Sequence, residues 1–137
     1  MMLTSLLEPE VSFTLTHRDE RGATATVAVA ITDPVFLGHF PGLPLFPGLF
    51  LIDFVDRTMR AWYSDGPLEL SAVVRCRFLS PVLPGDVVTV ELIANRPDQD
   101  LQCTALVSTT RRLAAEIRLR YRKPVAADLQ GTAGSAK

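Results

Sequence analysis

The chain has 137 residues, a formal net charge of −1 and a pI of about 6.1. This length predicts one domain with a full hydrophobic core, and the balanced charge excludes a globally basic nucleic-acid-binding protein. With 47% hydrophobic residues and a mean hydropathy of +0.21, the chain is slightly apolar for a soluble monomer, which favours a buried subunit interface.

The first part of the sequence predicts a β-hairpin followed by an irregular segment. Residues 11–18 and 24–31 alternate in polarity and flank a turn that ends in a glycine. The 19 residues from Pro34 to Ile52 carry no formal charge, as a membrane span would, but four prolines in this run exclude a continuous helix. The first ten residues lack the basic region of a secretory signal, so we expect a cytoplasmic protein without a membrane segment.

One helix is predicted from Pro47-Gly48 to about Trp62 or Tyr63. Its first two turns, LFLIDFV, are apolar on every side apart from Asp53, which predicts a helix enclosed by the fold and a buried carboxylate. Burying an unpaired carboxylate costs several kcal/mol, so Asp53 needs either a partner or a function. The simpler interpretation is an ion pair with Arg57 at i,i+4 spacing, and the alternative is a cavity shared with His39.

The remaining sequence predicts a meander of four strands, over residues 68–79, 87–94, 101–109 and 113–122. A hairpin, one helix and a meander indicate an α+β fold, in which a curved antiparallel sheet wraps around a single long helix. We expect one domain over residues 1–123 and a disordered tail over residues 124–137. The two cysteines, Cys76 and Cys103, are expected to be reduced core residues.

The last predicted strand has one apolar and one cationic face. Ile117, Leu119 and Tyr121 alternate with Arg118, Arg120 and Arg122. Most such stripes are solvated sheet faces, and the functional alternative is the electrostatic attraction of an acidic protein partner.

Three features within fifteen residues suit chemistry next to a carbonyl group: His39, the helix start at Gly48, and Asp53. A base removes the α-proton, the unpaired amides of the helix N-terminus stabilise the enolate-like charge, and a carboxyl group protonates a leaving group on the β-carbon. The pattern therefore favours elimination of water, or its reverse, although Pro-Gly also begins many helices that bind nothing.

The run GHFPGLPLFPGLFLID, with Asp53 fourteen positions after His39, resembles the signature of the hotdog-fold 3-hydroxyacyl-[acyl-carrier-protein] dehydratases. FLSPVLPGD, residues 78–86, resembles a second segment of that family. The resemblance implies a hotdog fold and a homodimer or higher oligomer, with His39 of one subunit facing Asp53 of the other. It also implies an acyl carrier protein as partner, no metal or redox cofactor, and a fatty-acid or polyketide pathway.

By this resemblance, His39 is the base at C2, Asp53 is the acid or water-binding group at C3, and the Gly48 amide polarises the thioester carbonyl. Two positions depart from the family pattern: Arg57 replaces a glutamine, and Phe54 replaces a small residue. A nearby arginine favours the charged form of a carboxylate, which weakens the acid role. Two alternatives therefore stay open, a thioester hydrolase of the same fold and a non-catalytic partner in a heterodimer with an active dehydratase.

Overall fold

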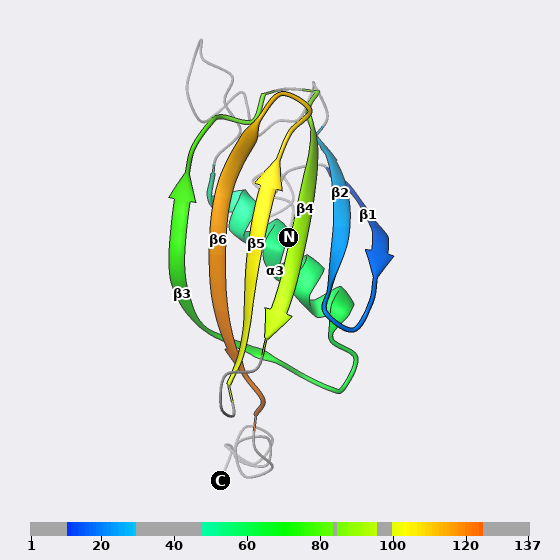
Figure 1. Ribbon diagram of the computed structural model, residues 1–137, viewed down its shortest axis with the longest axis vertical. Coiled ribbons are helices and arrows are strands. Elements are labelled where there is room, and N and C mark those ends of the chain that lie inside the picture. The colour runs from blue at the N-terminus through cyan, green and yellow to red at the C-terminus, as the bar shows by residue number, and fades with distance from the viewer. Residues whose placement is uncertain (1–10, 30–47, 84, 96–99, 125–137) are drawn as a thin grey trace, which may run out of the picture.

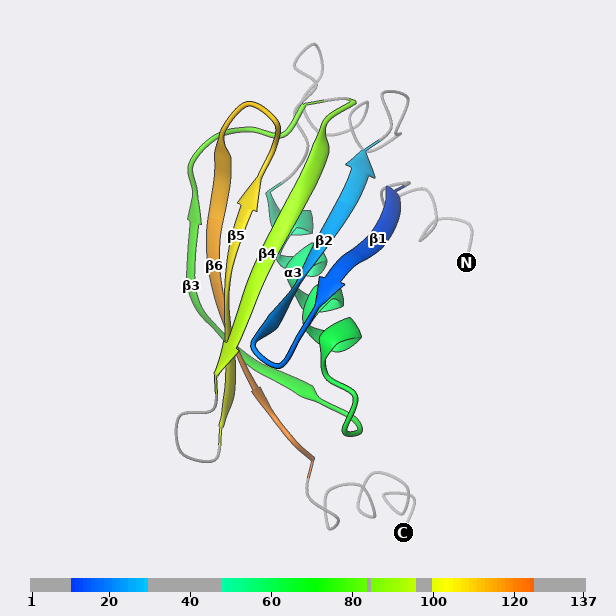
Figure 2. The same cartoon turned by 45° about the vertical axis from the view of Figure 1, so that its right-hand side comes forward.

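The computed structural model describes residues 11–29, 48–83, 85–95 and 100–124. Within these residues a single helix packs against one face of a curved antiparallel sheet, as Figures 1 and 2 show from two directions. The loop that carries His39 and the predicted tail beyond Pro124 lie outside the described residues.

The described elements are the predicted helix and six strands. They are β1 (Val11–Arg18), β2 (Gly22–Val29), α3 (Leu49–Trp62), β3 (Glu69–Phe78), β4 (Val87–Asn95), β5 (Leu101–Ser108) and β6 (Leu113–Arg122). The strand order is β1-β2-β4-β5-β6-β3, so the sheet begins at the predicted hairpin and ends at β3 (Figure 1). This architecture confirms the α+β prediction.

The predicted four-strand meander is wrong at its first strand. Only β4, β5 and β6 form a meander, whereas β3 pairs with β6, with Val73 opposite Leu119 and Phe78 opposite Ala115. The chain leaves the C-terminal end of α3, forms β3 at the far edge of the sheet and returns to β4. Such a crossover is set by long-range pairing, which the pattern of one strand does not encode.

The helix buries one stripe of side chains against the sheet. The buried members of α3 are Leu51, Phe54, Val55, Thr58 and Met59. Their spacing of three and four residues places them on one face, above the inward-pointing residues of β2, β4, β5 and β6. The opposite face is open, since Leu49 is 72% exposed. The expectation that the fold encloses this helix on all sides is therefore wrong for the single chain.

A polar network fixes the middle of α3 to β6. The Tyr121 hydroxyl donates to Asp56 Oδ1 at 2.6 Å, while Arg60 Nε donates to Asp56 Oδ2 at 3.0 Å. Arg60 also donates to the Leu68 carbonyl at 2.8 Å. Burial and the neighbouring Asp56 carboxylate raise the pKa of Tyr121, so the tyrosine stays a hydroxyl donor. Both oxygens of Asp56 are thus used in holding the helix in register.

The C-terminal end of α3 is tied to the β1–β2 turn. The indole N–H of Trp62 donates to the Asp19 carbonyl at 2.8 Å, and Arg18 donates to the Trp62 carbonyl at 2.7 Å. Gly22 begins β2 so close to β4 that a Cβ atom there would lie 1.9 Å from the Leu92 carbonyl oxygen. Only glycine fits this crossing of backbones.

The Cys103 thiol is predicted to be unreactive in the folded protein. Cys103 is buried in β5, and burial raises the pKa of its thiol to about 12. Because the thiolate is the nucleophile, we expect less than about 1% of the reaction rate of an unfolded cysteine at pH 8. Mass spectrometry after alkylation should find Cys103 unmodified in native protein and modified in denaturant. Rapid native labelling of Cys103 would contradict the buried position.

Candidate active site

The N-terminal end of α3 packs directly against the edge strand β3. Gly48 precedes the helix, and a Cβ atom built on it would lie 2.9 Å from the Phe78 ring. Packing therefore explains why a glycine occupies this position, because a side chain here would displace the phenylalanine. The first turn, Leu49–Ile52, contains no acidic residue, so no carboxylate within it neutralises the positive end of the helix dipole.

Asp53 lies on the open face of α3, five residues after Gly48. Its side chain is 44% exposed, so the prediction of a buried carboxylate is wrong for the single chain. The physical reason is that the sheet covers only one side of the helix. Such exposure removes the desolvation cost that a fully enclosed carboxylate would carry.

The predicted ion pair between Asp53 and Arg57 is confirmed. Arg57 Nε lies 2.9 Å from Asp53 Oδ2, and the Arg57 side chain is also 44% exposed. The second carboxylate oxygen of Asp53 has no partner among the described residues. Asp53 thus differs from Asp56, one turn along, whose two oxygens both bind protein groups. Of these two carboxylates on α3, Asp53 is the one with an oxygen left for a ligand.

The FLSPVLPGD segment contacts the C-terminal end of β2, the strand that precedes His39 in the sequence. The Val29 amide donates to the Asp86 carbonyl and the Gly85 amide donates to the Val29 carbonyl, both at 3.0 Å. Gly85 has a φ of +84°, and the Asp86 carboxylate accepts from the Leu83 amide at 2.7 Å. This turn therefore holds the end of β2 at Val29, the last described residue before the segment that contains His39.

An apolar strip follows β3 beside the candidate site. It consists of Leu70, Val73, Val74, Phe78 and Leu79, all of which are exposed. β3 forms the end of the described sheet, where it pairs only with β6 (Figure 2). The strip is therefore an apolar surface next to a strand edge, beside the start of α3.

The structure brings three of the predicted site residues, Gly48, Asp53 and Arg57, onto the same helix, whereas His39 lies outside the described residues. Phe78 was not predicted as part of the site. The sequence contained one indication of its role, because Phe78 is the first residue of FLSPVLPGD, the second segment that resembles the family. Among the described residues there is no cluster of three or more metal-ligating side chains, and no helix there is long and apolar enough to cross a membrane.

The family model for ApeI-like proteins, described as ApeI dehydratase, matches residues 14–125. The chain belongs to this dehydratase family. The match covers α3, the strands β2 to β6 and most of β1, so the expected hotdog-fold dehydratase family is confirmed.

Curated relatives of this ApeI-like protein are 3-hydroxyacyl-[acyl-carrier-protein] dehydratases named FabZ. The protein from Proteus mirabilis is 40% identical over 78 residues, which are 50% of this chain and 52% of the relative. The protein from Escherichia coli K12 is 33% identical over 86 residues, 57% of each chain. The chain thus spans about half the length of the curated relatives it matches.

Solved structures share the fold at low sequence identity. The dehydratase heterocomplex ApeI:P from Xenorhabdus doucetiae contains a chain that is 21% identical, with a TM-score of 0.63, covering 85% of this chain and 99% of that chain. The Escherichia coli PaaI protein is 22% identical, with a TM-score of 0.66, covering 81% and 78%. A hypothetical thioesterase with coenzyme A from Streptococcus pneumoniae is 12% identical, with a TM-score of 0.62, covering 80% and 84%. Together these confirm the hotdog fold.

Proposed function

We propose that this chain is a dehydratase that removes water from 3-hydroxyacyl thioesters carried on an acyl carrier protein, giving 2-enoyl thioesters. The observation that carries the proposal is the half-exposed Asp53 carboxylate on the open face of α3, five residues after Gly48. Membership of a dehydratase family and the names of the FabZ relatives support the same reaction class.

In the proposed reaction the Gly48 amide and the helix N-terminus bind the thioester carbonyl oxygen. His39 takes the proton from C2, and the electrons of that C–H bond form the C2–C3 double bond. The C3–O bond then breaks, and the hydroxyl group takes up a proton and departs as water. Asp53 supplies that proton in its acid form. Alternatively, Asp53 as the ionised partner of Arg57 holds the hydroxyl group as a hydrogen-bond acceptor, and His39 passes the proton that it took from C2 to the departing hydroxyl group.

We propose that the active unit is a homodimer, in which His39 and Asp53 of each site come from different subunits. The apolar strip on β3 supports this arrangement, because an exposed apolar edge beside the candidate site favours a second protein chain. No metal or redox cofactor takes part in the proposed reaction, since the proton transfers need only side chains and the helix amides.

Replacing Arg57 by glutamine is expected to raise kcat about 1.4- to five-fold. The change removes the ion pair with Asp53, and an exposed pair contributes about 0.2–1 kcal/mol, which sets the size of the effect. Steady-state kinetics with a 3-hydroxyacyl thioester measure it. The control is Arg60→Gln, which breaks the pair of Asp56 one turn along and should not raise kcat. A fall of tenfold or more in Arg57→Gln would assign Arg57 itself to turnover.

The Asp53–Arg57 pair also favours a second candidate function, that of a non-catalytic partner in a heterodimer. If this pair persists after assembly, Asp53 is held away from the substrate, and catalysis belongs to a related subunit. The ApeI:P dehydratase from Xenorhabdus doucetiae, which shares the fold, is itself a heterocomplex. Copurification with a related chain, together with inactivity alone and activity in the mixture, would favour this candidate over the homodimer.

The deciding experiment incubates purified protein with a 3-hydroxyacyl carrier-protein thioester and identifies the product by mass spectrometry. A product lighter by one water, with the thioester intact, supports the dehydratase. Release of the free carrier thiol by the wild type but not by Asp53→Asn would replace it with thioester hydrolysis. That outcome would fit a fold shared with the Streptococcus pneumoniae thioesterase.

A further inference from the structure

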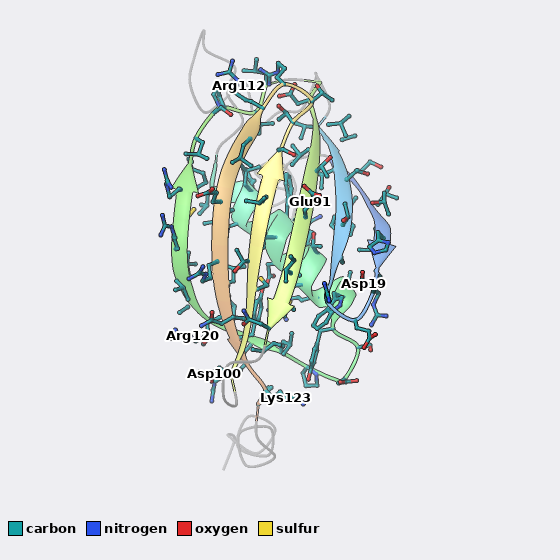
Figure 3. The ribbon with its side chains drawn as sticks, in the orientation of Figure 1. Asp19, Glu91, Asp100, Arg112, Arg120 and Lys123 are labelled. Carbon is teal, nitrogen blue, oxygen red and sulfur yellow. The ribbon has the colours of Figure 1, made fainter. Side chains whose placement is uncertain are left out.

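The face of the sheet turned away from α3 is strongly cationic at β3 and β6. Figure 3 looks onto this outer face, with Arg120 labelled near the C-terminal part of β6. Alternate residues of β6 are buried toward the core, so their neighbours point outward with their cross-strand partners on β3. The charged members are Arg75, Arg77, Arg118, Arg120, Arg122, Glu69 and Glu116.

Two of these five arginines are neutralised within the chain. Arg77 lies 3.3 Å from Glu116, and Arg122 lies 2.6 Å from Glu69. Arg75, Arg118 and Arg120 have no carboxylate partner among the described residues. The Arg118 guanidinium donates only to the Thr104 hydroxyl, at 3.3 Å. The cationic stripe expected at Arg118, Arg120 and Arg122 therefore changes, because Arg122 is paired and Arg75 takes its place.

The positions of these three guanidinium groups are unfavourable for the stability of the free chain. Arg75 is directly opposite Arg118 in the register of β3 and β6, and like charges at opposed positions destabilise a sheet. Arg120 Nε is buried and makes no hydrogen bond among the described residues. An anionic partner that covers these groups would remove the repulsion between Arg75 and Arg118 and offer acceptors to their exposed guanidinium groups.

A groove across β3, β6 and the neighbouring β5 adds apolar surface beside these arginines. Its volume is about 220 Å³, and it is lined by Arg75, Thr104, Leu106, Glu116, Ile117 and Arg118. Leu106 is exposed there, beside the two unpaired arginines. Cationic groups around exposed apolar atoms match the acidic, partly apolar surface of a protein better than a free anion, which would leave the leucine in water.

We propose that Arg75, Arg118 and Arg120 form a docking surface for the acidic carrier protein that delivers the substrate. This inference rests on the proposed function, which supplies the carrier. Arg75 is three residues before Phe78 in β3, and the two side chains point to opposite faces of this edge strand, with the Phe78 ring packed against Gly48.

The test compares two double variants with two substrates. In Arg75→Gln/Arg118→Gln, kcat/KM for a carrier-bound 3-hydroxyacyl thioester should fall about tenfold or more, whereas kcat/KM for the same acyl group on free pantetheine should not change. The matched control is Arg77→Gln/Arg122→Gln, which removes equal charge from ion-paired positions on the same two strands. We expect a loss of less than threefold in the control. Equal losses of kcat/KM in both variants would show that the effect depends on net charge alone and would overturn the proposed surface.

Direct binding separates this inference from the proposed chemistry. Fluorescence anisotropy with labelled holo carrier protein, carrying no acyl group, should give a Kd about tenfold weaker for Arg75→Gln/Arg118→Gln than for wild type at low salt. Equal affinities would overturn the docking surface even if the enzyme is active. A wild type that binds the carrier through these arginines but converts no thioester would overturn the dehydratase proposal and leave the surface standing. Thermal unfolding curves confirm that each variant is folded.

Discussion

Replacing Asp53 by asparagine is expected to lower kcat by about 10²- to 10⁴-fold, the range that a positioned acid–base group contributes. Asparagine keeps the shape of the side chain but can neither supply a carboxylic proton nor act as a charged acceptor. Because the Asp53 side chain is 44% exposed, losing its ion pair should change the free energy of unfolding by less than about 1 kcal/mol. Rates of enoyl thioester formation and thermal unfolding together measure both effects.

Arg57→Gln is the matched control for this experiment, since it breaks the same ion pair and leaves the carboxylate in place. Loss of activity in Asp53→Asn but not in Arg57→Gln would locate the function in the carboxylate rather than in the pair. His39→Ala should lose activity to a similar extent, as the base of the same reaction. Full activity in either Asp53→Asn or His39→Ala would overturn the proposed mechanism.

Local patterns in the sequence were sufficient to predict the elements. The helix begins after Gly48 and ends at Trp62, in agreement with the range predicted from Pro47-Gly48 to about Trp62 or Tyr63. The apolar face of β6 is confirmed, because Ile117, Leu119 and Tyr121 are all buried. Such features depend on residues near each other in the chain, whose spacing is visible in the sequence.

Long-range geometry was not predictable in the same way. The pairing of β3 with β6 places Arg75 opposite Arg118, although 43 positions separate them in the sequence. Asp53 was expected to be buried because the residues around it are apolar on all sides. The structure covers only the Leu51 side of the helix, so the apolar residues on the open side face away from the core of their own chain.

The open side of α3 and the exposed edge of β3 have one physical explanation under the proposed function. The contact between Gly48 and Phe78 joins two surfaces. One is the side of α3 that the sheet leaves uncovered, and the other is the apolar strip of β3. A second copy of the chain that covers the strip would remove apolar surface from water. It would also bring His39 of one subunit close to Asp53 of the other, as the resemblance to the dehydratases implies.

Replacing Val73 by aspartate should therefore convert the proposed dimer into monomers and lower kcat/KM at least 100-fold. Val73 is 47% exposed in the single chain, and a charge at an unpaired strand edge opposes the addition of another strand. Light scattering should give the 15.0 kDa of one chain instead of twice that mass. The control is Val87→Asp, at a 42% exposed valine on β4, three strands away from β3, which should stay dimeric and active. A dimeric, active Val73→Asp protein would show that the subunits meet through a different surface and that the β3 edge does not complete the site.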